Sequence, residues 1–361
     1  MRCSGTDFYR MPVTIYDLAK ALQVSGSTVS RALRGDPRVS ERTRKRITEF
    51  AERKGYRTNV HARNLRSQHT DSIGLIVNQW EGEFTSSVLA GVERVTTAAG
   101  YDLTVASSMD SYDAEVAIAE KFFQRRVDGL IVSIAAETRR LDHLLSIARW
   151  GAPVVLINAG QMTNKYSSVA ADYRHCGLLA TRHLLSAGCR RIVHMTGPAD
   201  REKYRQGCRG YLRALRESGL RPDAALLFVN DLGPEPVSAA AESVVQMIPR
   251  PDGLFVMDDY AAAVCMRTFR EHGLRIPEDI AIVGYSGDRP AVLTEPALTT
   301  VGIPGFKIGE VAARVVIGGL PSADAQHPLR KVVVQGHLLV RGSSLRVGHP
   351  TNINEGKEPP G

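Results

Sequence analysis

Residues 13–47 have the sequence VTIYDLAKALQVSGSTVSRALRGDPRVSERTRKRI, which contains three short segments with apolar residues at helical spacing. Thr14 and Ser25 precede the first two segments and are good N-cap residues. Gly35 follows the second segment, where a helix often ends in a left-handed residue. A third helix is expected to begin after Ser40. Two short helices joined by three residues predict a helix-turn-helix motif.

The three expected helices each have one apolar and one polar face. The apolar residues are Ile15, Leu18, Ala19 and Leu22, then Val29, Ala32 and Leu33, then Ile47, Phe50 and Ala51. The polar face of the second helix carries Ser27, Ser30, Arg31 and Arg34. Arginine is the commonest donor to guanine edges, and small polar residues let the backbone approach the bases. This face favours a DNA-reading helix over an ordinary three-helix bundle with a solvated basic surface.

The excess positive charge is confined to the first part of the chain. Residues 11–70 contain 13 Lys and Arg against 5 Asp and Glu, a balance of +8, and residues 1–10 add +1. Residues 71–361 therefore sum to −1, since the whole chain carries +8. A basic module joined to a nearly neutral body is the charge distribution expected of a polyanion-binding protein.

A basic segment, RTNVHARNLRSQHT, follows at residues 57–70. Asn59 can cap a short helix in it, and Ala62 and Leu65 form its apolar pair. Such a segment buries too little surface to offset its ordering entropy when alone. It is either a helix that forms with a partner or a simple flexible tether.

From residue 72 the pattern changes to short apolar runs alternating with helical stretches. The runs are SIGLIVN, YDLTVASS, VDGLIVSIA and PVVLIN, with helices expected at 84–99, 112–124 and 138–149. After residue 188 the rhythm repeats with RRIVHMTG, LLFVND, GLFVMDD and IAIVGYSG. This alternation predicts two α/β lobes with parallel sheets, and a ligand site where the carboxyl ends of the strands face the cleft.

Other functional classes find little support in the residues. No window of eighteen apolar residues and no signal-peptide core is present, so a cytoplasmic location is expected; the start is left open between Met1 and Met11. The five cysteines are scattered and the ten histidines lack metal-binding spacing, so neither a metal nor another cofactor is expected. There is no nucleotide-binding glycine loop, nucleophile elbow or zinc signature, so no catalytic residues are proposed.

The segment from Val13 to Leu65 closely resembles the DNA-binding region of the lactose-repressor (LacI/GalR) family. Further matches, including RQGCRGYLRALRESGL and GLRIPEDIAIVGY, extend the resemblance over nearly all of residues 13–344. The resemblance implies a helix-turn-helix headpiece at 11–57, a hinge helix or linker at 58–71, a two-lobed periplasmic-binding-protein-like core at 72–344, and a flexible tail at 345–361.

The resemblance also implies a set of DNA-binding residues. Base-reading positions would be held by Gly26, Ser27 and Arg31. Phosphate contacts or helix positioning would involve Thr14, Tyr16, Ser25, Ser30, Arg34 and Asn59, and the set also includes Thr28 and Ala62. Leu65 matches the side chain that wedges open a minor-groove base step. Two residues depart from the family pattern: Thr58 stands where Pro is common, and His61 where an aliphatic residue is usual.

For the effector, the resemblance points to six residues. They are Phe84, Asn158, Arg205, Leu232, Asp258 and Ser286. Arg205 has an alternative interpretation as a surface ion-pair residue. Ser286 stands where the family usually has an Asp, and Gly82-Glu83 replace a common Asn-Pro. The ligand is therefore left open between a sugar, a sugar acid, a nucleobase and no ligand at all.

The sequence thus predicts a transcriptional regulator, with repression as the family default. Its expected partners are double-stranded operator DNA, a small-molecule effector and a second copy of the chain, as a homodimer or a higher oligomer; no membrane contact is expected. The alternatives are a periplasmic sugar-binding transport protein, a small-molecule binding protein without a DNA role, and an α/β enzyme.

Overall fold

The computed structural model describes residues 13–56, 69–160, 165–321 and 328–346. The chain divides between Thr70 and Asp71 into two compact units, the headpiece and the core. None of the described helices is long and apolar enough to cross a membrane.

The headpiece consists of three helices, α1 (Ile15–Leu22), α2 (Gly26–Leu33) and α3 (Glu41–Arg53). Thr14 and Asp17 form a capping box at α1, and the side chains of Ser25 and Ser40 cap α2 and α3. These observations confirm the expected helix starts.

Packing of the three headpiece helices follows the predicted apolar faces. Leu18, Val29 and Ile47 are fully buried at their centre. The predicted residues Ile15, Leu22, Leu33 and Phe50 are only partly buried and pack against this centre. Phe50 stays partly exposed at the edge, where the charged groups of Arg53 and Lys54 lie near its ring.

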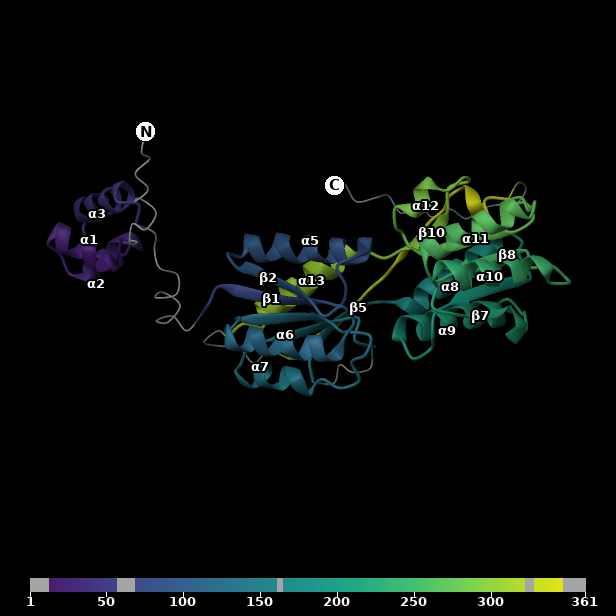
Figure 1. Cartoon of the computed structure of the whole chain (residues 1–361), viewed down its shortest axis with the longest axis horizontal. Helices are drawn as coiled ribbons and strands as arrows, with labels where there is room; N and C mark the ends of the chain where they lie inside the picture. Colours follow the sequence, from purple (N-terminus) through teal and green to yellow (C-terminus); the bar gives the residue numbers. More distant parts are fainter. Residues whose placement is uncertain (1–12, 57–68, 161–164, 322–327, 347–361) are drawn as a thin grey trace, which may run out of the picture. The chain divides into compact units, whose positions relative to one another are not determined.

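The first lobe of the core is a six-stranded parallel sheet covered by helices on both faces (Figure 1). Its strand order is β11-β5-β4-β3-β1-β2, and every neighbouring pair is parallel. The strands are β1 (Ser72–Val77), β2 (Asp102–Ser107), β3 (Gly129–Ser133), β4 (Val154–Ile157), β5 (Ser167–Ala171) and β11 (Lys331–Val334). The helices are α5 (Glu83–Ala98), α6 (Tyr112–Gln124), α7 (Leu145–Arg149) and α13 (Gly305–Gly318).

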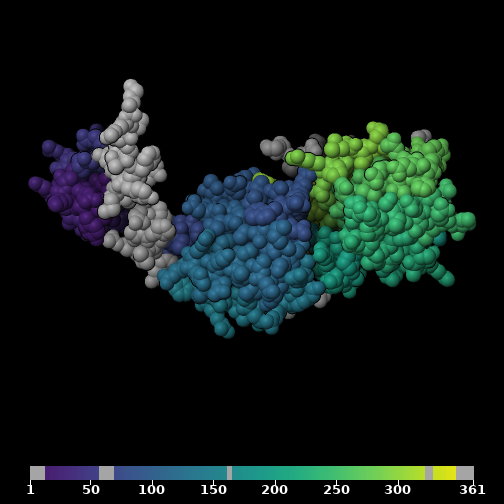
Figure 2. Space-filling view, in the orientation of Figure 1, coloured from purple at the N-terminus to yellow at the C-terminus, as the bar shows by residue number. Residues whose placement is uncertain are grey.

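The second lobe repeats this plan with the order β12-β10-β9-β8-β6-β7, in which β12 alone runs antiparallel. Its strands are β6 (Ile192–Thr196), β7 (Leu227–Val229), β8 (Gly253–Val256), β9 (Ala281–Ser286), β10 (Thr299–Gly302) and β12 (His337–Leu339). Its helices are α8 (Tyr173–Ser186), α9 (Glu202–Glu217), α10 (Pro234–Gln246), α11 (Asp259–Glu271) and α12 (Pro290–Leu293). Figure 2 shows the first lobe in blue and the second in teal to green.

The chain passes between the lobes three times. It leaves β5 for α8 in the second lobe, returns from β10 to α13 in the first, and passes from β11 to β12. The predicted α/β class is therefore confirmed, but the lobes are not two consecutive pieces of sequence. The four strands β5, β10, β11 and β12 were not predicted.

One predicted helix, at 138–149, is much shorter in the structure. Only a 3₁₀ turn at Asp142–Leu144 and the five-residue α7 form. The preceding loop is instead tied to the buried carboxylate of Glu115, which accepts hydrogen bonds from the Ala135 N–H (2.7 Å) and the Thr138 hydroxyl (3.0 Å). These bonds hold an irregular loop at the cleft in place of the first turn of the predicted helix.

The end of the described chain is held against the second lobe by hydrogen bonds. Ser343 and Ser344 are fully buried, and Ser344 Oγ lies 2.7 Å from Nε2 of His183. The Arg346 guanidinium donates to the carbonyl oxygens of Asp252 (2.6 Å) and Pro277 (2.9 Å). Arg346, the second residue of the expected flexible tail at 345–361, is therefore held by hydrogen bonds, and the remainder from 347 lies outside the described residues.

Candidate functional site

The outward face of α2 carries the side chains that the sequence predicted for DNA reading. Ser27, Arg31 and Arg34 are exposed, and Thr28 and Ser30 are half-buried. Within the described headpiece no hydrogen bond or ion pair holds the Arg31 guanidinium, whereas Arg34 Nε donates to the carbonyl oxygen of Ser30 (3.2 Å). Arg31 is therefore available to reach a partner.

Tyr16 and the start of α2 form a second part of this surface. The Tyr16 side chain is 75% exposed, and a Cβ at Gly26 would lie 3.8 Å from its ring. Ser25 Oγ lies 2.8 Å from the hydroxyl oxygens of both Ser27 and Thr28. The structure thus brings Tyr16, Ser25, Gly26, Ser27 and Thr28 together at the N-terminus of α2, where backbone N–H groups and the helix dipole favour phosphate.

The other predicted DNA-binding residues have different positions. Thr14 caps α1 and is exposed, and its hydroxyl donates to Asp17 Oδ2 (2.7 Å). Asn59, Ala62 and Leu65, together with Thr58 and His61, lie outside the described residues.

A cavity of about 500 Å³ lies within the core and is lined by residues of both lobes. The strands' carboxyl ends supply many of these residues, as the parallel-sheet prediction requires. Five of the six predicted effector residues are in its lining, namely Phe84, Asn158, Arg205, Asp258 and Ser286.

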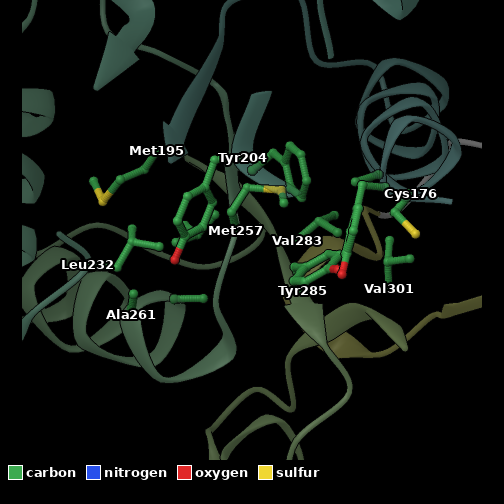
Figure 3. Close-up of a cluster of buried hydrophobic side chains, with 14 of the residues drawn as sticks. Cys176, Met195, Tyr204, Leu232, Met257, Ala261, Val283, Tyr285 and Val301 are labelled. Carbon is green, nitrogen blue, oxygen red and sulfur yellow. The ribbon is translucent and has the colours of Figure 1, made fainter. Parts of the chain in front are cut away.

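Leu232 is the exception among the predicted effector residues. Its side chain is 8% exposed and belongs to the buried core of the second lobe, and it is absent from the cavity lining. Figure 3 shows it beside Tyr204 and Ala261 in this apolar cluster. Its backbone N–H donates to Asn230 Oδ1 (2.9 Å), and its φ is +63°. Leu232 is therefore a packing residue in this structure.

Arg205 has features of both roles that the sequence suggested, an effector-binding residue and an ion-pair residue. It lines the cavity, and its guanidinium is paired with Glu202 and donates to the carbonyl oxygen of Ala199 (3.3 Å). Asn158 has φ +55°, and its Oδ1 accepts from the Ala171 N–H (3.2 Å). These interactions hold both side chains at the cavity wall.

The loop after β9 supplies a carboxylate that the sequence analysis missed. Ser286 has φ +120°, and its hydroxyl donates to Asp288 Oδ2 (2.6 Å) in the cavity lining. The loop is held by the fully buried Asp259, which accepts from the Gly287 and Asp288 N–H groups (2.8 Å each) and from the Thr300 hydroxyl (2.6 Å). Burial raises the pKa of Asp259 to about 6. An acidic side chain is thus present although Ser286 replaces the expected Asp.

Other lining residues were also missed. Asp110 follows β2 and accepts hydrogen bonds from Gln79 Nε2 (2.7 Å), the Ala136 N–H (2.9 Å) and Asn78 Nδ2 (3.2 Å). Its position in the loop at the carboxyl end of β2, three residues after the strand, was a usable signal. Tyr173 and Tyr285 add aromatic surface to the lining.

Acidic groups outnumber basic groups in the cavity lining. The carboxylates are those of Glu81, Glu83, Asp110, Asp200, Glu202, Asp258 and Asp288, and the basic side chains are those of Arg139, Arg201, Lys203 and Arg205. Burial raises the pKa of both Asp258 and Asp288, while Lys203 acts to lower it. The cavity is therefore rich in hydrogen-bond acceptors.

Two polar contacts join the lobes at the cavity. Glu83 Oε2 accepts from the Arg289 N–H (2.7 Å), and Arg139 Nη2 lies 3.2 Å from Asp200 Oδ2. Each contact links a first-lobe residue to the second lobe, so any separation of the lobes must break them.

A helix-turn-helix with an exposed basic face, joined to a two-lobed core with a polar cavity, defines a class of DNA-binding regulators with a ligand-binding core. Residues 14–59 match the model of bacterial regulatory proteins of the lacI family, and residues 181–344 match a periplasmic binding protein-like domain. Catabolite control protein A of Priestia megaterium is 31% identical over 307 residues, which cover 85% of this chain and 92% of that protein. This chain belongs to the LacI family of transcriptional regulators, as the sequence resemblance indicated.

Solved structures agree with this assignment. The complex of the transcriptional regulator CelR with cellobiose is 26% identical with a TM-score of 0.66, covering 92% of this chain and 99% of that one. The lac repressor dimer bound to operator and an anti-inducer has a TM-score of 0.79 at 21% identity, covering 93% of this chain and all of that one. The second match supports the fold.

Proposed function

We propose that this regulator is a repressor that binds a palindromic operator as a homodimer, and that a small molecule in the core cavity controls its operator affinity. The observation that carries the proposal is the exposed Arg31 on α2, whose guanidinium has no hydrogen bond or ion pair within the described headpiece and lies in a segment that holds the chain's excess charge. The lac repressor matched in fold is a dimer bound to operator. Action on chromosomal DNA places the protein in the cytoplasm, and the proposal assigns it no enzymatic step.

The candidate DNA-binding residues of the headpiece form two groups according to their expected partners. Ser27 and Arg31 are proposed to contact base edges, with Gly26 permitting the close approach. Phosphate contacts or positioning are assigned to Thr14, Tyr16, Ser25, Thr28, Ser30 and Arg34. The roles of Asn59, Ala62 and Leu65 remain predictions from the sequence.

The proposed effector is a neutral, polyhydroxylated molecule of the sugar class. Hydroxyl groups can donate to Asp110, Asp258 and Asp288, which form a surplus of acceptors, and an anionic ligand would meet repulsion from them. The Phe84, Tyr173 and Tyr285 rings offer apolar wall surface. CelR, which is similar to this chain, was solved with cellobiose.

Operator recognition is tested with Arg31→Ala. We expect a loss of about 1–3 kcal/mol in specific binding and relaxed discrimination at one base pair, because a bidentate guanine contact is removed. The matched control is Arg53→Ala, an exposed arginine near the end of α3. Operator selection followed by titration at fixed salt measures both. Equal losses on all operator variants would assign Arg31 to a phosphate instead.

Effector binding is tested by a thermal-shift series of neutral sugars, sugar acids and nucleobases, since a ligand of the folded state raises the melting temperature. We expect a shift from a neutral sugar, and its loss in Asp258→Asn and Arg205→Ala while operator binding persists. A shift produced only by acids or nucleobases would contradict the proposed ligand class. An undiminished response in both variants would contradict the site.

A further inference from the structure

On the surface of the second lobe, α8 and α9 cross at very close range. A Cβ at Gly177 would lie 2.1 Å from the carbonyl oxygen of Gly207, and one at Gly210 would lie 2.1 Å from that of Arg174. The two helix backbones therefore touch directly. Such close contact brings the outward side chains of both helices together along one line.

Arginines line the groove at this crossing. Arg174 from α8 and Arg209, Arg213 and Arg216 from α9 surround a hollow of about 360 Å³, together with Leu212 and Glu217. We call these six residues the arginine groove. The α9 arginines are spaced by four and three residues, so they project from one face of the helix.

The charges in the arginine groove are not balanced. Glu217 is its one carboxylate, and it is bound by Arg213 Nε (2.6 Å) and, from the adjoining part of α8, by Arg182 Nη2 (2.7 Å). These hydrogen bonds hold the pKa of Glu217 below its usual value, so it stays ionised. Among the described residues, no ion pair is found for Arg174, Arg209 or Arg216. Three exposed guanidinium groups thus converge with no internal partner.

We propose that the arginine groove binds a small phosphate-bearing anion, at a site separate from the core cavity. Guanidinium groups match phosphate oxygens with paired hydrogen bonds and remain charged at all physiological pH values. The volume of the hollow falls near the lower end of the range for small-molecule sites. Bound phosphate oxygens would supply the acceptors that the groove itself lacks.

A small anion fits this surface better than a protein partner. Protein interfaces concentrate their binding energy in buried aromatic and apolar side chains. No large hydrophobic side chain of α8 or α9 is exposed, and Leu212 in the groove is only partly so. The available recognition chemistry is therefore almost entirely ionic hydrogen bonding.

The test uses the full-length protein and inorganic pyrophosphate, titrated by calorimetry at constant ionic strength. The groove variant combines Arg174→Ser with Arg209→Ser, and the control combines Arg125→Ser with Arg149→Ser. The control residues are also exposed arginines for which no ion pair is found among the described residues, but they lie in the first lobe, where Arg125 is the C-cap residue of α6 and Arg149 is the last residue of α7. The two variants lose the same charge, so general electrostatic attraction falls equally in both.

We expect saturable pyrophosphate binding that weakens by about tenfold or more in the groove variant and by less than about twofold in the control. Operator affinity without pyrophosphate should be unchanged in both, which also shows that the variants are folded. Absence of saturable binding by the wild type would overturn the proposal, as would equal weakening in both variants. Binding of duplex DNA that is lost with the groove arginines, without binding of pyrophosphate, would also overturn it.

Discussion

The two lobes of the core have the same plan, and each contains one close crossing between two helices. In the first lobe α5, which follows β1, packs against α13, which the chain forms just after it returns from the second lobe. In the second lobe α9, which follows β6, packs against α8, which the chain forms just after it leaves the first lobe (Figure 1). Both contacts depend on glycine. A Cβ at Gly91 would lie 2.1 Å from the Phe306 carbonyl oxygen, and one at Gly309 would lie 2.1 Å from that of Val88, much as Gly177 meets Gly207.

The charges around these two crossings are arranged differently. In the first lobe Glu310 is 5% exposed and is paired with Arg94, Lys307 and Arg314. The Arg94 guanidinium also lies over the Phe306 ring, 4.7 Å from its centre. In the second lobe Glu217 is 36% exposed, and no carboxylate among the described residues pairs with Arg174, Arg209 or Arg216. At the first crossing the basic side chains are thus paired with a buried carboxylate, whereas at the second crossing several arginines face solvent.

The largest expected effect comes from substituting a glycine at either crossing. Gly177→Ala and Gly309→Ala each place a Cβ against a backbone carbonyl that cannot move without shifting a helix. We expect each to lower the free energy of unfolding by about 3 kcal/mol or more. Urea unfolding measures the loss. The control is Gly318→Ala, whose Cβ would meet nothing within 4 Å; a control loss equal to the others would contradict the packing argument.

The second prediction concerns the pH dependence of stability that arises from His194 in the second lobe. His194 in β6 is stacked between Tyr211 and Phe255, whereas Leu75 occupies the equivalent place in β1. Its Nδ1 lies 3.2 Å from the Phe255 carbonyl oxygen, and its Nε2 has no partner among the described residues. Burial lowers the pKa of His194 to about 4 from an ordinary value of 6.5. The second lobe thus has a buried imidazole in its first strand, at a place where the first lobe has the apolar side chain of Leu75.

The sign of this pH dependence follows from the depressed pKa. The unfolded chain binds a proton at His194 below pH 6.5, but the folded chain does so only near pH 4. Stability from this site is therefore fully present above pH 6.5 and is lost as the pH falls toward 4, by roughly 3 kcal/mol in total. His194→Leu should flatten this part of the stability curve measured by urea unfolding. An unchanged slope between pH 6.5 and 4 would place the acid sensitivity elsewhere.

Sequence patterns found the elements whose information is local. Runs such as SIGLIVN and VDGLIVSIA are buried strands in the centre of a sheet, and the caps Thr14 and Ser25 act within one helical turn. The missed strand β11 is partly exposed and pairs with β5, more than 160 residues away, as in Lys331 with Ser168. No local pattern encodes such a partner, and the crossing of α13 into the first lobe is hidden for the same reason.

The same distinction applies to the cavity. Asn158 directly follows β4, and Asp258 is the second residue after β8, so the strand-end rule was enough to bring them to the lining. Asp288 reaches the cavity only because the buried Asp259 holds the 287–288 backbone, which is a tertiary effect. Leu232 was assigned by its position in the family pattern, yet its side chain is buried in the core cluster of the second lobe.

The smallest expected effect comes from neutralising the carboxylates at the two crossings, Glu310 in the first lobe and Glu217 in the second. Burial alone would raise the pKa of Glu310, but the hydrogen bond and charge of Arg94, with Lys307 and Arg314, bring it below the usual value. Glu310→Gln keeps the shape and removes the charge, and we expect it to lower stability at pH 7 by about 1–2 kcal/mol, because its exposed partners regain water. Glu217→Gln should cost less, since water already screens its pairs, and it should strengthen pyrophosphate binding by removing the one negative charge in the groove. Urea unfolding and calorimetry of the two variants measure these opposite responses. If Glu217→Gln destabilised the protein as much as Glu310→Gln and left pyrophosphate binding unchanged, the two crossings would be electrostatically equivalent.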